Sequence, residues 1–337
     1  MKLPVKKRYL FPLLLIATYV LGPQTDFPEF TGEIQDLTIS LMDLDNHIAQ
    51  KESQFDNIKS NNQSQIIWAD SVRKTPYAVV YLHGFSASPL EGDPIHKEFA
   101  ERYGCNMYLP RLAGHGIDDK ESFKNLTPKA LIDSAKEAIA IGKLLGDKVI
   151  LMSCSTGGTL SVYLSALNQE DVHAQILFSP NIAIHNSSTK LLAYPWGLQI
   201  LKQMNGSDYF KIRSTQESKL FWTHTYRIEG LVALENLLQE TMTNDIFEKN
   251  SQPIFVGYYY KNEEECDHVV SVPAMKDFFE KVSTPKDQKQ MVPFPNVGNH
   301  VVCSSLKSKD LEEVRVATFA FAEEVLGLKK KSFQINE

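Results

Sequence analysis

The sequence predicts an α/β fold with a mostly parallel, doubly wound sheet, and three observations support this prediction. Short runs rich in β-branched and aromatic residues recur from residue 65 onward, and several are apolar nearly throughout, as strands covered on both faces are. Longer stretches with helical spacing of apolar residues lie between these runs. Hydrophobic residues make up 43% and charged residues 23% of the 337 residues, which is usual for a folded globular protein.

Seven short apolar runs are predicted as strands. They are Gln65–Ala69, Tyr77–Leu82, Asn106–Leu109, Val149–Ser153, Gln175–Phe178, Ile254–Tyr260 and Gln290–Phe294. The clearest helical pattern between them is Pro128–Leu145, which carries Leu131, Ala135 and Ile139 along one side. Further helices are predicted at Gly158–Leu167, Pro273–Val282 and Lys309–Leu326. We therefore expect one α/β domain at residues 65–330.

One interval, from Ala183 to Asn250, interrupts the alternation because it contains no convincing strand. A connection of that length with aromatic residues of its own is more typical of a functional lid than of a plain loop. We predict a helical lid insertion at about residues 184–227. For the helical run Gly230–Met242, an ordinary crossover helix is an equally good interpretation.

The N-terminus, residues 1–22, has the pattern of a signal peptide or a signal anchor. Basic residues at positions 2, 6, 7 and 8 precede the apolar stretch Tyr9–Leu21, which is shorter than the roughly 18 residues of a spanning helix. Gly22 is followed by Pro23, so no clean cleavage site is present. The pattern predicts an exported, extracytoplasmic chain that is cleaved or anchored by this segment. Membrane association on the cytoplasmic face and a buried N-terminal helix remain alternatives.

Residues 23–64 have a looser pattern, with one amphipathic helix and a polar loop at Lys59–Ser64. We interpret this segment as an N-terminal arm that leads into the domain.

A serine-rich turn directly follows the predicted strand Val149–Ser153. The sequence there is Ser153-Cys154-Ser155-Thr156-Gly157-Gly158, and a helical pattern begins at once. A sharp strand-to-helix turn needs small neighbours, because its apex residue adopts a strained backbone conformation. The turn resembles the nucleophile elbow of the α/β-hydrolase superfamily, with Ser155 at the apex, but has Ser153 where that family has glycine. A serine-rich turn that only caps a helix is the alternative.

Two further segments resemble the monoacylglycerol lipase and carboxylesterase branch of this superfamily. The strand Tyr77–Leu82 ends in His83-Gly84-Phe85-Ser86-Ala87-Ser88-Pro89, and the next strand is followed by Pro110-Arg111-Leu112-Ala113-Gly114-His115-Gly116. The resemblance implies an oxyanion hole formed by the backbone N–H groups of Phe85 and Thr156. We interpret His83, Arg111 and His115 as residues that brace loops.

The resemblance also implies a base and an orienting acid after the serine in the chain, in the order Ser, Asp or Glu, His. Asp267 precedes Val-Val and a proline that opens a helix, as in the acid loop of the family, and His300 follows the last predicted strand. The predicted catalytic residues are therefore Ser155, Asp267 and His300. The neighbouring run Glu263–Glu265 is typical of a solvated loop.

Composition and motifs exclude several other classes of function. The formal net charge of −6 gives no electrostatic basis for nucleic-acid binding. The histidine spacings form no metal motif, and the glycines form neither a P-loop nor a dinucleotide fingerprint. We expect no cofactor and no metal. Four cysteines are too few for a disulfide scaffold, but pairing of Cys266 with Cys303 remains open.

The resemblance implies a serine hydrolase that cleaves carboxylic esters through an acyl-enzyme intermediate. The aromatic lid residues suggest a pocket for an apolar acyl group; they are Tyr194, Trp196, Phe221 and Trp222. An acyltransferase or thioesterase would use the same three residues, and a non-catalytic binding protein of the same fold is a third interpretation. The expected partner is a small-molecule ester, and the N-terminal segment could contact a membrane. The sequence leaves the natural substrate and the oligomeric state open.

Overall fold

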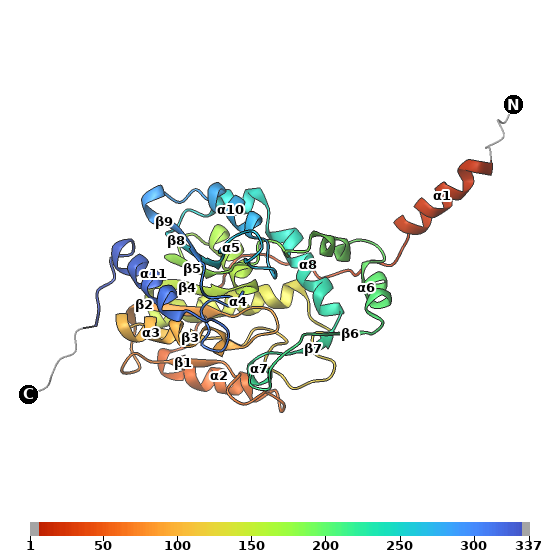
Figure 1. Ribbon diagram of the computed structural model, residues 1–337. Helices are drawn as coiled ribbons and strands as arrows, with labels where there is room; N and C mark the ends of the chain where they lie inside the picture. Colours follow the sequence, from red (N-terminus) through yellow and green to blue (C-terminus); the bar gives the residue numbers. More distant parts are fainter. Residues whose placement is uncertain (1–6, 332–337) are drawn as a thin grey trace, which may run out of the picture.

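The computed structural model describes residues 7–331, and a seven-stranded sheet with helices on both sides forms its centre (Figure 1). The strands are β1 Gln65–Ile67, β2 Thr75–Leu82, β3 Asn106–Leu109, β4 Gly146–Cys154, β5 Ala174–Phe178, β8 Ile254–Tyr259 and β9 Lys289–Phe294. Their order across the sheet is β1-β3-β2-β4-β5-β8-β9. Only β1 is antiparallel to its neighbour. The predicted mostly parallel α/β architecture is confirmed.

Alternate residues of β2 enter two apolar cores, one on each face of the sheet. The helices that cover the sheet are α3 Ile95–Tyr103, α4 Pro128–Leu145, α5 Thr156–Leu167, α8 Glu229–Thr241, α9 Asn244–Lys249, α10 Val272–Lys281 and α11 Leu311–Glu324. Ala78, Val80 and Leu82 pack in the core that includes residues of α4, α5, α8, α9 and α10. Val79 and Tyr81 pack in the core that includes residues of α3 and α11. Because successive residues of such a strand enter opposite cores, the strand is apolar nearly throughout.

The longest of these helices, α4, has the bounds that the sequence predicts because its N-terminal signals are strong. The Thr127 hydroxyl accepts a hydrogen bond from the Ala130 N–H and caps the first turn, and Pro128 occupies the first helical position. Leu131, Ala135 and Ile139 are all fully buried against the sheet.

The chain between β5 and β8 contains five further elements besides α8 and α9. They are the 3₁₀ helix η3 Ser187–Ala193, the helices α6 Gly197–Asn205 and α7 Ser218–Phe221, and the antiparallel strands β6 Tyr209–Lys211 and β7 Thr225–Arg227. The sequence prediction missed this two-stranded ribbon, because strands of three residues carry too short a pattern. The run predicted at Gly230–Met242 is α8, and its Ala233 and Leu237 enter the main core. It is therefore a crossover helix. We call residues 184–227 the insertion; their Tyr226 also enters the main core, and Phe210 packs against it.

The N-terminal arm packs on the surface of the α/β domain. A short 3₁₀ helix, η1 Leu41–Asp43, leads into α2 Leu44–Glu52, whose Leu44 and Ile48 are buried in the main core. Phe27 and Phe30 of the preceding extended chain pack against the same core. Two further 3₁₀ helices are η2 Pro89–Gly92 and η4 Lys286–Gln288.

The helix α1, Lys7–Val20, extends away from the body of the protein (Figure 1, red). The side chains of Leu13, Leu14 and Ile16 are exposed. Within residues 7–331, no helix has both the length and the apolar character needed to cross a membrane. The basic residues Lys2 and Lys6, part of the predicted signal, lie outside the described residues.

Candidate active site

Ser155 is the single residue between β4 and α5, and its backbone is strained. Its φ of 54° and ψ of −119° are unusual for any residue other than glycine. Four backbone hydrogen bonds hold it there. Its N–H donates to Phe178 O at 3.0 Å, and its carbonyl accepts from the N–H groups of Gly158 at 2.8 Å, Asn181 at 2.9 Å and Thr159 at 3.3 Å. The turn is therefore fixed from both the β5 side and the helix side.

The two glycines after Ser155 are required by the close approach of neighbouring chain. A Cβ at Gly157 would lie 1.9 Å from Leu82 O, and one at Gly158 would lie 2.7 Å from Pro180 Cβ. Ser153, where the superfamily motif has glycine, still pairs with Leu82 and Leu177 within the sheet. Because Ser153 remains in regular strand geometry, its side chain does not disturb the turn.

His300 and Asp267 come from loops after β9 and β8, and the structure brings them into contact. The Nδ1–H of His300 donates to Asp267 Oδ2 at 2.6 Å. The other oxygen, Asp267 Oδ1, accepts from the backbone N–H groups of Val269 at 2.8 Å and Val270 at 3.1 Å. Asp267 is almost fully buried, so these three hydrogen bonds fix both the imidazole and the carboxylate.

Burial and mutual attraction act in opposite directions on this pair. Burial raises the pKa of Asp267, but the charge and hydrogen bond of His300 outweigh it and leave the pKa below its usual value. Burial likewise lowers the pKa of His300, but Asp267, with a smaller contribution from Glu91, raises it above its usual value. Both shifts favour the ion pair.

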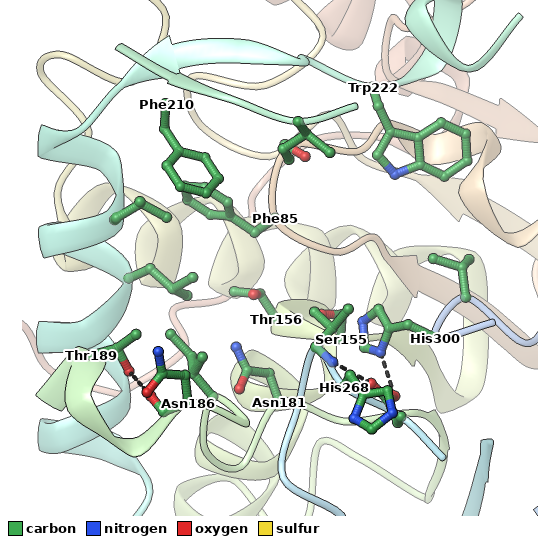
Figure 2. Close-up of a pocket in the computed structure, with 18 of the residues that line it drawn as sticks. Phe85, Ser155, Thr156, Asn181, Asn186, Thr189, Phe210, Trp222, His268 and His300 are labelled. Carbon is green, nitrogen blue, oxygen red and sulfur yellow. Dashed lines mark hydrogen bonds and ion pairs between the residues drawn. The ribbon is translucent and has the colours of Figure 1, made fainter. Parts of the chain in front are cut away.

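The second nitrogen of His300, Nε2, is buried and has no hydrogen-bond partner among residues 7–331. Figure 2 shows His300 and Ser155 facing the same cavity, which Asp267 also lines. The three residues predicted from the sequence therefore meet at one place, and Nε2 is the atom of His300 free to exchange a proton with a hydroxyl group.

Two backbone amides beside Ser155 are also free. Thr156 is the first residue of α5, so its N–H has no acceptor within the helix. The N–H of Phe85 in the turn after β2 likewise has no partner among the described residues. The two turns are in contact, because a Cβ at Gly84 would lie 3.0 Å from Ser155 Cβ. Phe85 and Thr156 both line the cavity.

This geometry was compared with known proteins. No protein-family model and no curated protein sequence matches the chain. Among solved structures, one from a study of LipS and LipT, two metagenome-derived lipolytic enzymes, aligns with 78% of this chain and 98% of its own at 15% identity, with a TM-score of 0.64. The chain has the α/β-hydrolase fold.

Two further α/β-hydrolase structures extend the comparison. The monoacylglycerol lipase of Paleococcus ferrophilus covers 76% of this chain and 95% of its own, at 13% identity and a TM-score of 0.55. The alignment with a thermophilic esterase from Thermogutta terrifontis covers 80% of this chain and 97% of the esterase, at 15% identity and a TM-score of 0.51. The shared architecture includes nearly the whole of each of these proteins and 76% to 80% of this chain.

A cavity of about 1070 Å³ lies over Ser155, between the α/β-hydrolase core and the insertion. It is at the upper end of the range for small-molecule sites. Its wall is mainly apolar, with contributions from Leu191, Leu201, Met204, Phe210, Leu231 and Leu234. A second wall is polar and contains Asn181, Asn186 and Thr189 (Figure 2).

Only one of the four aromatic residues predicted for the pocket lines this cavity, namely Trp222. Tyr194 is about half exposed, and Phe221 packs against the core on the α3 and α11 side. Trp196 contacts the N-terminal segment, where its Nε1–H donates to Thr18 O. Composition identified an apolar insertion but not which of its side chains face inward, because that depends on how its helices pack.

Residues that the sequence assigned to loop bracing have that role in the structure. The Nδ1–H of His83 donates to Gly84 O at 2.9 Å, and its Nε2 accepts from Leu112 N at 3.1 Å. Burial lowers the pKa of His83 well below its usual value, so the ring is neutral. Arg111 forms a buried ion pair with Glu52 of the arm, at 2.8 Å.

All four cysteines are free thiols, so a Cys266–Cys303 disulfide is absent. The two side chains face different neighbours: Cys266 Sγ contacts Glu263 O, and Cys303 Sγ contacts the Tyr81 hydroxyl. Proximity of their loops is therefore not sufficient for a bond.

Sequence reasoning missed Glu91, a buried carboxyl group that lines the cavity. In the sequence it is a single acidic residue shortly after the His-Gly-Phe turn, and no repeating pattern distinguishes it from a surface carboxylate.

Proposed function

We propose that the protein is a serine hydrolase that cleaves carboxylic esters through an acyl-enzyme intermediate. The observation that carries this proposal is the position of Ser155 at a strained turn, in one cavity with a buried His300–Asp267 pair. A hydroxyl is a weak nucleophile and needs a base, which in turn needs an orienting carboxylate. The two unpaired amides of Phe85 and Thr156 supply donors for the negative oxygen of a tetrahedral intermediate.

In the first half of the reaction, Ser155 Oγ attacks the ester carbonyl while His300 Nε2 takes its proton. The C–O bond of the ester then breaks, and the imidazolium gives that proton to the leaving alcohol. In the second half, His300 removes a proton from a water molecule that attacks the acyl carbonyl. The imidazolium then gives that proton to Ser155 Oγ as the acyl–enzyme C–O bond breaks, which releases the acid and regenerates Ser155 and neutral His300. Asp267 stabilises the imidazolium in both halves and keeps Nδ1 protonated.

The substrate class that the cavity supports best is an ester with an apolar acyl group. The mainly apolar wall would bury an acyl chain, and Asn181, Asn186 and Thr189 could bind a more polar alcohol part. Two findings support a substrate of the lipase and carboxylesterase class: the resemblance of the His83–Pro89 and Pro110–Gly116 motifs to that branch, and a structural neighbour that is a monoacylglycerol lipase.

The test is hydrolysis of p-nitrophenyl esters of increasing acyl length by the wild type and by Ser155→Ala. We expect turnover that increases from acetyl toward medium chains, and a loss of at least about 10³-fold in the variant, because removing the nucleophile removes the covalent route. Wild-type protein without turnover on any ester, or a variant as active as the wild type, would contradict the proposal. Turnover only when an acceptor alcohol is added would indicate an acyltransferase instead.

A further inference from the structure

Glu91, in the short helix η2, is a buried carboxyl group that the proposed reaction does not use. It is 2% exposed, and no Lys, Arg or His within residues 7–331 forms an ion pair with it. Its Oε2 accepts a hydrogen bond from Gly84 N at 2.7 Å and another from the Tyr81 hydroxyl at 3.3 Å. A buried acidic side chain without a counter-ion is unusual, so its position calls for a functional explanation.

The carboxyl group lies against the turn that carries Phe85. A Cβ at Gly84 would lie 2.9 Å from Glu91 Oε1 and 3.0 Å from Ser155 Cβ, so both residues pack closely against Gly84. The Gly84 carbonyl is held separately, by His83 Nδ1 at 2.9 Å and Ala87 N at 3.2 Å.

These contacts determine where the Phe85 N–H points. Gly84 has no side chain to limit its φ and ψ, so the direction of the next amide depends on anchors at both of its peptide groups. The carbonyl contacts fix the peptide that carries the Phe85 N–H, and Glu91 fixes the peptide before it. Without Glu91, the Gly84 N–H would be a buried donor with no partner.

Glu91 also interacts electrostatically with the base. Titratable groups around it come from β2, β4 and the segment after β9; they are Tyr81, Cys154, His300, Cys303 and Lys307. Burial raises the pKa of Glu91 to about 7, against the opposing effects of the Gly84 N–H and the charge of His300. Reciprocally, the negative charge of Glu91 contributes to the raised pKa of His300.

We propose that Glu91 is a positioning residue: it holds the Gly84–Phe85 turn in the geometry that stabilises the oxyanion, and its negative charge stabilises the His300 imidazolium. The inference rests on the proposed function. One carboxylate is thus in contact with the turn and acts electrostatically on the base.

Two substitutions separate the two effects. Glu91→Leu removes the acceptor of the Gly84 N–H, and we expect kcat to fall about 10²-fold with KM unchanged, as on loss of an oxyanion donor. Glu91→Gln keeps an oxygen acceptor but no charge, and we expect it to retain kcat within about tenfold of the wild type. Its kcat/KM should persist to lower pH than in the wild type, because loss of the negative charge lowers the pKa of His300.

Glu235→Gln is the matched control, because Glu235 is a buried carboxyl on α8 that does not line the cavity. Its kcat, KM and pH profile should equal those of the wild type, and thermal unfolding of each variant establishes that it is folded. Wild-type kcat in Glu91→Leu, or an unchanged acid limb in Glu91→Gln, would overturn the inference. If Glu91→Leu does not fold, the Glu91→Gln pH profile decides alone. Failure of the wild type on every ester would instead refute the proposed function.

Discussion

His300 and Asp267 shift each other's pKa in opposite directions, and this reciprocity has a measurable consequence for the proposed reaction. The base must be neutral to accept a proton, so kcat/KM falls as the pH drops through the pKa of His300. Because that pKa is raised, the acid limb of the wild-type profile is expected above about pH 6.5, the usual value for histidine.

The variant Asp267→Asn tests whether the carboxylate of Asp267 raises the pKa of His300. The amide cannot stabilise the imidazolium, and we expect kcat to fall about 10³–10⁴-fold. The remaining burial lowers the pKa of His300, so the residual activity should have its acid limb at lower pH than the wild type. A pH series of kcat/KM measures both effects.

The control for this variant is Asp277→Asn, which changes a carboxylate on the surface of α10 that pairs with Lys281. This variant should leave the pH profile of kcat/KM unchanged. An Asp267→Asn variant with wild-type kcat and an unshifted acid limb would show that His300 does not act with Asp267 as its partner.

The turn between β4 and α5 is the element that depends most strictly on sequence. Gly157→Ala would place a Cβ 1.9 Å from Leu82 O, a contact that only a shift of the backbone could relieve. We expect the free energy of unfolding to fall by at least about 3 kcal/mol, or soluble protein to be lost.

Gly206→Ala provides the comparison for this element. Gly206 has a φ of +65° with no atom within 4 Å of the added Cβ, so only the backbone cost of about 1–2 kcal/mol applies. Urea unfolding of both variants measures the difference. If both variants lost the same small amount of unfolding free energy, the close approach of Leu82 O to Gly157 would not constrain the turn.

The elements differ in how far the sequence could predict them, and the reason is physical. The strand β3 and the helix α4 have the predicted bounds because a short, fully buried apolar run and the Thr127–Pro128 cap are local signals. The convergence of Ser155, Asp267 and His300 on one cavity could be predicted, because each lies in the turn or loop that follows a recognisable strand. The ribbon of β6 and β7, the inward side of the insertion and the role of Glu91 depend on contacts between distant segments, which no local pattern encodes.

At the scale of the whole molecule, the N-terminal arm is joined to the domain by a buried ion pair. Arg111 Nε donates to Glu52 Oε2 at 2.8 Å, while Ser64 Oγ donates to Glu52 Oε1 at 2.8 Å. Arg111 also donates to the carbonyl of His115 at 3.1 Å. The loop that resembles the lipase motif is therefore tied to the arm on one side, while its His115 packs against the Phe85 ring on the other.

Arg111→Met should destabilise the protein by about 3–5 kcal/mol, because it leaves Glu52 buried without its partner. The double variant Arg111→Met, Glu52→Leu should recover part of this loss, since both charges are then absent. Denaturant unfolding of the single and double variants gives the interaction free energy between Arg111 and Glu52. A single variant as stable as the wild type would mean that the Arg111–Glu52 ion pair contributes nothing to the stability of the fold.

The most direct test of the central claim is to map the adduct of a fluorophosphonate probe, which reacts covalently with activated serines. The account predicts one adduct, on Ser155, whose formation is abolished in Ser155→Ala and strongly slowed in His300→Ala. An adduct on another residue, or labelling of Ser155 at an unchanged rate in His300→Ala, would contradict the assignment of this serine and this histidine to one catalytic unit.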